Sequence, residues 1–378
     1  TAASSGYYYE ALDFAPLETS NLKLETFFSP DYVTARERFR NAAQATGAAS
    51  YALPLDAKGP GGEALTMDIA WIGNPRPQRV LLQTSGLHGV EAFAGSAMQL
   101  HLLEHPPAIP ADSALVLVHV LNPYGMAWLR RANENNVDLN RNFLKQGEAW
   151  AGAPVLYRHI DAVLNPASAP GFDLFHLRAA WLALRHGFHP LKQAVAQGQY
   201  EFPRGLFYGG RQLEQGPRLY LDWLAQHLMD LPYLFALDVH TGLGEWGQET
   251  LIPEPGVGVT AAAGLSLTLG RPLIETTRSD SVSYTIRGGM GGILPQTLPA
   301  TRIDFLLQEI GTYPPLRVFY ALREENRWHY YGTGDLQHTA KLRLREALCP
   351  ASAVWRRQAV GRGVALAHAV VDRIFTKR

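Results

Sequence analysis

Short apolar runs alternate with segments of mixed polarity along most of the chain. Brief, continuous apolar runs bounded by polar or turn-forming residues predict β-strands. By this criterion we expect strands at Met67–Ile72, Arg79–Thr84, Ala114–Leu121, Tyr233–Val239 and Ile303–Ile310. The run at Ala114–Leu121 is apolar enough to predict burial on both faces of a sheet.

Longer segments of helical composition lie between and after these strands. They are Ala35–Gly47, Glu91–Glu104, Glu214–Met229, Thr260–Thr268, Leu316–Arg327 and Ala353–Ile374, with Ser352 as the predicted N-cap of the last helix. Alternation of strands and helices predicts an α/β fold, with a mixed, mostly parallel central sheet flanked by helices. We expect a single domain over residues 1–378, with a mainly helical insertion at about 151–203.

The charge balance excludes several classes of partner. Lys and Arg together number 34, as do Asp and Glu, so the net charge is zero. A neutral chain lacks the one-sided field expected of a nucleic-acid binder or of a protein that binds anionic membranes. No apolar run approaches the ~18–20 residues of a transmembrane helix. We therefore expect no nucleic acid and no membrane partner, while homo-oligomerisation stays open.

Cys349 is the single cysteine of the sequence. One thiol forms no intrachain disulfide and cannot build a cysteine metal site, so any metal must be held by His and carboxylate ligands. A chain without disulfides fits a reducing compartment. We expect a cytoplasmic protein, with a signal peptide removed earlier as the open alternative.

Three strand ends carry residues that suit metal chemistry. His88 and Glu91 follow the strand at Arg79–Thr84, and the intervening turn contains Gly86 and Gly89. His240 ends the strand at Tyr233–Val239, and Glu309 ends the strand at Ile303–Ile310. Active sites of open α/β sheets form where loops leave the carboxyl ends of strands. His88, Glu91 and His240 can therefore hold one Zn²⁺, with Glu309 left as a base.

A polar segment after the strand at Ala114–Leu121 adds positive charge. It begins with Asn122-Pro123-Tyr124-Gly125, continues through Arg130-Arg131 and ends with Asp138-Leu139-Asn140-Arg141-Asn142-Phe143. Arginine and asparagine side chains near a strand end suit the binding of a carboxylate or a developing oxyanion.

The order of these motifs resembles that of the zinc carboxypeptidase superfamily. HxxE, NPxG, an arginine, DLNRNF, a strand-end His and a strand-end Glu follow one another between residues 85 and 313. The superfamily includes the carboxypeptidase A-like enzymes and the succinylglutamate desuccinylase/aspartoacylase branch. The closest likeness is to a bacterial subgroup labelled only as a domain of unknown function.

The resemblance implies a role for each matching residue. His88, Glu91 and His240 would bind zinc, and Glu309 would be the general base and proton shuttle. Arg131 would polarise the scissile carbonyl, with the adjacent Arg130 as the alternative. The remaining implied roles are substrate-carboxylate binding by Asn140 and Arg141, orientation of the His88 ring by Asp138, and substrate capping by Tyr284. Asp238 is not expected to bind the metal, and at most it would orient the ring of His240.

Two further motif matches favour structural explanations. His101-Leu102-Leu103-Glu104-His105 matches an inverted zinc motif, but it ends a helix before two prolines, so we expect its histidines to flank a solvated face. Gly256-Val257-Gly258-Val259-Thr260-Ala261 loosely matches a dinucleotide fingerprint, but it lacks the preceding strand and indicates a helix start. No GxSxG motif occurs, which argues against a serine nucleophile.

Together these features predict a zinc-dependent amide hydrolase. We expect a metallocarboxypeptidase-like enzyme that removes the carboxy-terminal residue of a peptide. The alternative is an N-acyl amino acid deacylase of the aspartoacylase type, because a substrate with a free carboxylate suits both. A metal-free binding protein on the same scaffold is the remote alternative from another class.

Overall fold

The computed structural model describes residues 23–254, 259–273 and 286–376. Within them, seven strands form one sheet in the order β1-β2-β4-β3-β5-β7-β6. The strands are β1 (Ala49–Lys58), β2 (Ala64–Gly73), β3 (Arg79–Ser85), β4 (Ser113–His119), β5 (Tyr233–Gly242), β6 (Glu249–Pro253) and β7 (Arg302–Gly311).

The centre of the sheet is parallel and its edges are antiparallel. Strands β4, β3, β5 and β7 pair in parallel, whereas β2 runs antiparallel to both β1 and β4, and β6 runs antiparallel to β7. The predicted α/β fold with a mixed, mostly parallel sheet is confirmed. All five predicted strands are present, and the two that the sequence pattern missed, β1 and β6, lie at the edges of the sheet.

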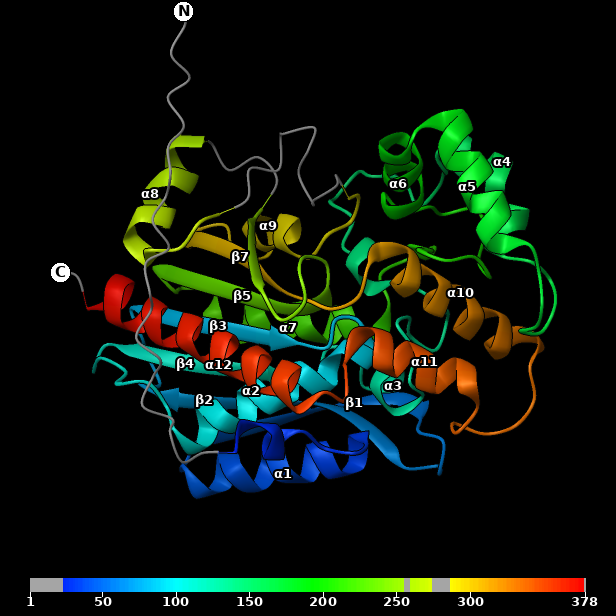
Figure 1. Cartoon of the computed structure of the whole chain (residues 1–378). Helices are drawn as coiled ribbons and strands as arrows, with labels where there is room; N and C mark the ends of the chain where they lie inside the picture. The colour runs from blue at the N-terminus through cyan, green and yellow to red at the C-terminus, as the bar shows by residue number, and fades with distance from the viewer. Residues whose placement is uncertain (1–22, 255–258, 274–285, 377–378) are drawn as a thin grey trace, which may run out of the picture.

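Helices cover both faces of the sheet (Figure 1). One face packs against α1 (Tyr32–Ala45), α2 (Ala92–Glu104) and α12 (Ala353–Val370), whose apolar side chains share a core with Leu81 and Leu237. The other face packs against α7 (Gln215–Leu228) and α9 (Leu294–Thr297), which share a second core with Val80 and Leu82. Successive residues of β3 thus point into opposite cores, which explains its continuous apolar sequence.

A helical layer extends beyond the sheet on the side where the parallel strands end (Figure 1). It contains α4 (Val155–Leu164), α5 (Phe175–His186) and α6 (Phe188–Ala196), which lie beside α10 (Pro315–Tyr331). The remaining helices are α3 (Pro123–Ala127), α8 (Val259–Leu269) and α11 (Thr339–Leu348). Helices α4–α6 fall within the segment predicted to be an insertion, and its status as part of one domain stays a prediction.

All six predicted helices are present, with differences at their ends. The helix expected from Glu91 begins at Ala92, because Gly89–Glu91 forms a 3₁₀ turn first. Ser352 accepts a hydrogen bond from the backbone of Trp355, which confirms the predicted N-cap of α12. That helix ends at Val370 and continues as a π-helical turn to Phe375. Helix α11 was not predicted.

His101 corrects one sequence expectation. Its side chain does not face solvent, because α2 is packed between the sheet and α12 and is buried around most of its circumference. His101 is 4% exposed and packs against Phe27, with ring centroids 5.1 Å apart. His105 is exposed, as expected. None of the helices in the described part of the chain combines the length and the apolar character needed to span a membrane.

Candidate metal centre

The turn after β3 can form only with glycine at two positions. Gly86 adopts φ +66°, and a Cβ atom there would lie 2.6 Å from Cβ of Ala92. A Cβ on Gly89 would lie 2.2 Å from the Cα atom of Gly125. The close approach lets the backbone of Gly89 and Val90 pair with the carbonyls of Arg131 and Arg130. The turn therefore brings the arginine segment next to His88 and Glu91.

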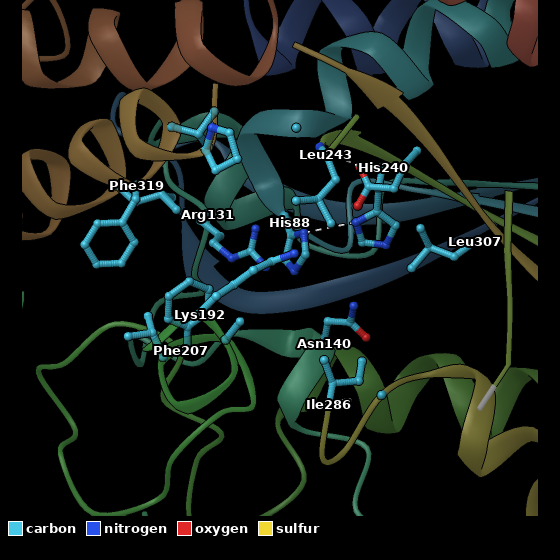
Figure 2. Close-up of a pocket in the computed structure, with 18 of the residues that line it drawn as sticks. His88, Arg131, Asn140, Lys192, Phe207, His240, Leu243, Ile286, Leu307 and Phe319 are labelled. Atoms are coloured by element: carbon cyan, nitrogen blue, oxygen red, sulfur yellow. Dashed lines mark hydrogen bonds between the residues drawn. The ribbon is translucent and has the colours of Figure 1, made fainter. Parts of the chain in front are cut away.

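His88, Glu91 and His240 converge on one point. Among the described residues they form the one group of three metal-ligating side chains whose ligand atoms lie within 4.8 Å of one another. Nδ1 of His88 lies 3.0 Å from Oε1 of Glu91 and 3.1 Å from Nδ1 of His240. Nδ1 of His240 lies 3.2 Å from Oε2 of Glu91. Figure 2 shows the two imidazoles facing each other across this point.

Each imidazole of the centre has a carboxylate behind it. Nε2 of His88 lies 3.1 Å from Oδ1 of Asp138, and Nε2 of His240 lies 2.6 Å from Oδ2 of Asp238. A carboxylate at Nε2 keeps the proton on that nitrogen and leaves Nδ1 with a lone pair toward the centre. The structure places Asp138 where the resemblance puts it. It also gives Asp238 the same relation to His240, on the shared face of β5.

The electrostatics favour a cation at the centre. Burial opposes charge on His240, but the carboxylates of Asp238 and Glu91 hold the pKa of its imidazole well above the usual value. Burial also opposes charge on Glu91, yet His88 and His240 hold the pKa of its carboxyl well below the usual value. Two imidazole nitrogens and one carboxylate form a donor set that fits Zn²⁺ with an open position.

Arg131, and not Arg130, faces the centre. Its Nη1 donates to Oε1 of Glu91 at 3.1 Å, and its Nε donates to Oδ2 of Asp138 at 3.0 Å. Arg130 points the other way: its Nε donates to Oε1 of Glu325 at 3.0 Å, in a network that includes Lys341. The geometry therefore favours Arg131 for a role at the site and gives Arg130 a buried ion pair.

Glu309 stands beside His240 because the two residues are opposite each other in the parallel pairing of β5 with β7. Its carboxylate is 6% exposed, and its Oε2 accepts a hydrogen bond from the backbone of Leu243 at 3.4 Å. Burial, with the negative charge of Glu91, raises the pKa of Glu309 to about 7, although His240 acts to lower it. A carboxyl with a pKa near neutrality is suited to take up and release a proton.

Asn140 and Arg141, which were expected to bind a substrate carboxylate, have different surroundings in the structure. Asn140 lines the pocket next to the centre. Arg141 does not line it: the side chain is fully buried, Nη1 donates to the carbonyl of Asn140, and Nε donates to the carbonyl of Ala196 at 3.0 Å. Substrate binding by Arg141 thus stays a prediction that this placement does not favour. Tyr284 lies outside the described residues.

A cavity of about 450 Å³ is lined in part by His88, Glu91 and His240. Its lining includes Lys192 of α6, which sequence analysis missed, and most of the other lining side chains are apolar. Figure 2 shows Lys192 reaching toward Arg131 and His88 from the opposite side of the cavity. Burial lowers the pKa of the Lys192 ammonium group. A lone lysine in a helix of ordinary amphipathic pattern gives no local signal of a site, so the sequence could not have identified it.

Comparison with known proteins gives a family. The family model described as "Protein of unknown function (DUF2817)" matches residues 28–362. No curated protein matches the sequence. Membership in a family labelled as of unknown function, which the motif order suggested, is thereby confirmed.

Several solved structures show some likeness to the chain. They include carboxypeptidase A from Helicoverpa armigera, at 14% identity over 89% of this chain and 73% of that chain, with a TM-score of 0.44. A metallo-carboxypeptidase from Burkholderia cenocepacia shares 11% identity over 91% of this chain and 69% of that chain, with a TM-score of 0.45. A metallo-carboxypeptidase from Pseudomonas aeruginosa in complex with (2-guanidinoethylmercapto)succinic acid shares 14% identity over 89% and 69%, with a TM-score of 0.42. Because the family model spans most of the sequence, the chain belongs to the family described as a protein of unknown function, DUF2817.

Proposed function

We propose that this chain is a metal-dependent amide hydrolase that removes the carboxy-terminal residue of a peptide, using one Zn²⁺ held by His88, Glu91 and His240. The observation that carries the proposal is the convergence of two imidazole Nδ1 atoms and one carboxylate within 4.8 Å. Each imidazole is also fixed from behind by a carboxylate. Such fixed, buried ligands beside a cavity are typical of a metal site that acts on a ligand.

The chain's own side chains supply the remaining steps of amide hydrolysis. A bound Zn²⁺ supplies Lewis acidity and lowers the pKa of water. Glu309 takes a proton from the attacking water and returns it to the leaving nitrogen, a task that suits a buried carboxylate next to His240. Arg131, whose guanidinium already lies beside Glu91, donates to the carbonyl oxygen as negative charge develops there.

Asn140 and Lys192 would hold the free carboxylate of the substrate. Both line the cavity, and Lys192 brings a positive charge to a largely apolar surface. An ammonium group in such surroundings binds a carboxylate more strongly than it does in water. Arg141 would contribute indirectly, by holding Asn140 in position. Its hydrogen bonds to two backbone carbonyls link the Asn140 segment to the end of α6.

An N-acyl amino acid is the second candidate substrate. The apolar lining of the cavity favours it, because a peptide backbone would need polar partners along its length. The bond broken and the residues that act on it are the same for both substrates.

A hydrolysis screen on the zinc-loaded protein tests the proposal. Dipeptides with free carboxy termini are compared with N-acyl amino acids, and product amino acid is measured. We expect Glu309→Gln to abolish turnover while the zinc content stays at that of the wild type. The matched control is Glu254→Gln, because burial also raises the pKa of this pocket carboxyl to about 7 and Glu254 should be dispensable for turnover. Full activity of Glu309→Gln, or loss of turnover in both variants, would refute Glu309 as the base.

A further inference from the structure

Part of the lining of the cavity beside the candidate metal centre is apolar. We call it the apolar arm and define it by Phe175, Leu182, Leu191, Val195, Phe319 and Leu322. These side chains come from α5, α6 and α10. Protein interiors are normally packed to the density of organic crystals, with few voids larger than a water molecule. An apolar space of this size, joined to a metal site, therefore calls for an occupant that can replace water within it.

We infer that the apolar arm receives a long, unbranched acyl chain, so that the substrate class is the long-chain N-acyl amino acid. The inference rests on the proposed amide hydrolysis, and it favours the second candidate substrate, the N-acyl amino acid, over the peptide. Burial of apolar chain surface is the interaction that such a lining can offer, and it has little to offer a polar or charged acyl group.

The position of the arm matches the acyl side of the scissile amide. The guanidinium carbon of Arg131 lies 5.4 Å from the centroid of the Phe207 ring, which also lines the cavity. Figure 2 shows Phe207 and Phe319 on the Arg131 side of the centre, with Lys192 beside Phe207, and Leu307 on the His240 side. With its carbonyl oxygen held by Arg131, the substrate can place its acyl carbons next to Phe207, at the start of the arm.

The apolar lining also reaches the protein surface. Phe188 and Leu316 both line the cavity, yet they are 56% and 49% exposed. By contrast, Phe175, Leu182 and Val195 are at most 8% exposed. Within the described residues, the apolar lining thus includes both exposed and buried side chains, so a chain longer than the buried part can extend toward solvent.

The cavity also offers polar groups for the carboxylate of the same molecule. The carboxylate of an N-acyl amino acid would be held by Asn140 and Lys192, while the acyl tail lies in the arm. Hydrolysis breaks the bond between the acyl carbon and nitrogen. Water provides the hydroxyl for the acyl carbon and the proton for the nitrogen. The products are a fatty acid and a free amino acid, with no change of oxidation state.

A series of acyl lengths on one amino acid tests the inference without any mutation. The zinc-loaded wild type is assayed with acetyl, hexanoyl, decanoyl and tetradecanoyl derivatives, each kept monomeric. Burial is worth roughly 0.8 kcal/mol per methylene, or about a three- to fourfold gain. We therefore expect kcat/KM to rise on the order of a hundredfold from hexanoyl to decanoyl. A flat or falling series would overturn the inference.

A substitution that fills the apolar arm provides a second test. Leu182 lines the cavity, so the larger side chain of Leu182→Trp should occupy part of the apolar arm. We expect this variant to lower the ratio of decanoyl to hexanoyl turnover by at least about tenfold. Leu184→Trp on the same helix is the matched control, because Leu184 is 88% exposed and does not line the cavity. Should Leu182→Trp not fold, Val195→Trp from α6 serves the same purpose. An unchanged ratio in a folded arm variant would contradict the inference.

The outcomes separate the inference from the proposed function. Hydrolysis of acetyl derivatives or dipeptides with no preference for long chains would refute the acyl-chain occupant and leave the amide hydrolase standing. Absence of hydrolysis of every amide by protein that holds stoichiometric zinc would overturn both.

Discussion

Asp238 and His240, two residues apart on β5, form the shortest contact of the metal centre: Oδ2 of the aspartate lies 2.6 Å from Nε2 of the imidazole. The other oxygen of Asp238 accepts a hydrogen bond from Thr84 at 2.7 Å. The carboxylate is therefore held by the neighbouring strand as well as by the histidine. The ring of His240 is fixed before any metal binds.

Asp238→Asn should weaken zinc binding by roughly 10–100-fold, because an amide no longer selects the His240 tautomer that presents a lone pair at Nδ1. Competition with a chromogenic chelator measures the affinity. The control is Asp222→Asn, an exposed aspartate on α7. Equal zinc affinity in wild type and Asp238→Asn would show that the carboxylate does not support the ligand.

The rate of hydrolysis should fall as the pH falls, because Glu309 acts in its ionised form. Burial raises the pKa of Glu309 to about 7 in the protein without metal. A bound cation favours the ionised form, so the acidic limb of kcat/KM should lie below pH ~7. The pH profile of the zinc-loaded enzyme checks this expectation. A rate that rises toward low pH would contradict the assignment.

Removing the charge of Arg131 should lower activity, whereas removing the charge of Arg130 should lower stability. Arg131→Met should lower kcat by about 10²–10³-fold at saturating zinc, because it removes the donor to the developing oxyanion. Arg130→Met should instead destabilise the fold by roughly 3–5 kcal/mol, because Arg130 shares a buried network with Glu325. Urea denaturation and steady-state kinetics separate the two effects. The reverse pattern would assign the catalytic role to Arg130.

Lys192→Met should raise KM by about 10–100-fold and change kcat little, because it removes a charged hydrogen bond to the substrate carboxylate. Arg178→Met is the control, since it removes an exposed positive charge from the same helical layer. A substrate analogue in which an amide replaces the carboxylate should lose affinity for the wild type but not for Lys192→Met. An equal loss in both proteins would exclude the contact.

The sequence could predict that the candidate metal ligands and Glu309 lie close together, because adjacent parallel strands end at one edge of the sheet. His88 follows β3, His240 lies on β5 and Glu309 lies on β7, and these three strands are neighbours. Residues that the sequence pattern places at the ends of these strands therefore lie close together in the fold. Strands β1 and β6 were missed because they lie at the edges, where side chains need not form a continuous apolar run.

The lining of the cavity was harder to predict, because neighbours in sequence can point in different directions. Asn140 and Arg141 are consecutive in a 3₁₀ turn, yet Asn140 lines the cavity and Arg141 turns to the carbonyl of Ala196. Lys192 and the apolar arm come from helices packed over the strand ends. Their contribution depends on tertiary packing, which no local motif encodes.

Titration of zinc into chelator-stripped protein, while hydrolysis of an N-acyl amino acid is followed, tests the central claim most directly. We expect activity to rise with added zinc and to reach its plateau at one equivalent per chain, bound by His88, Glu91 and His240. Failure to take up zinc, or hydrolysis at an undiminished rate after the metal is removed, would contradict the account.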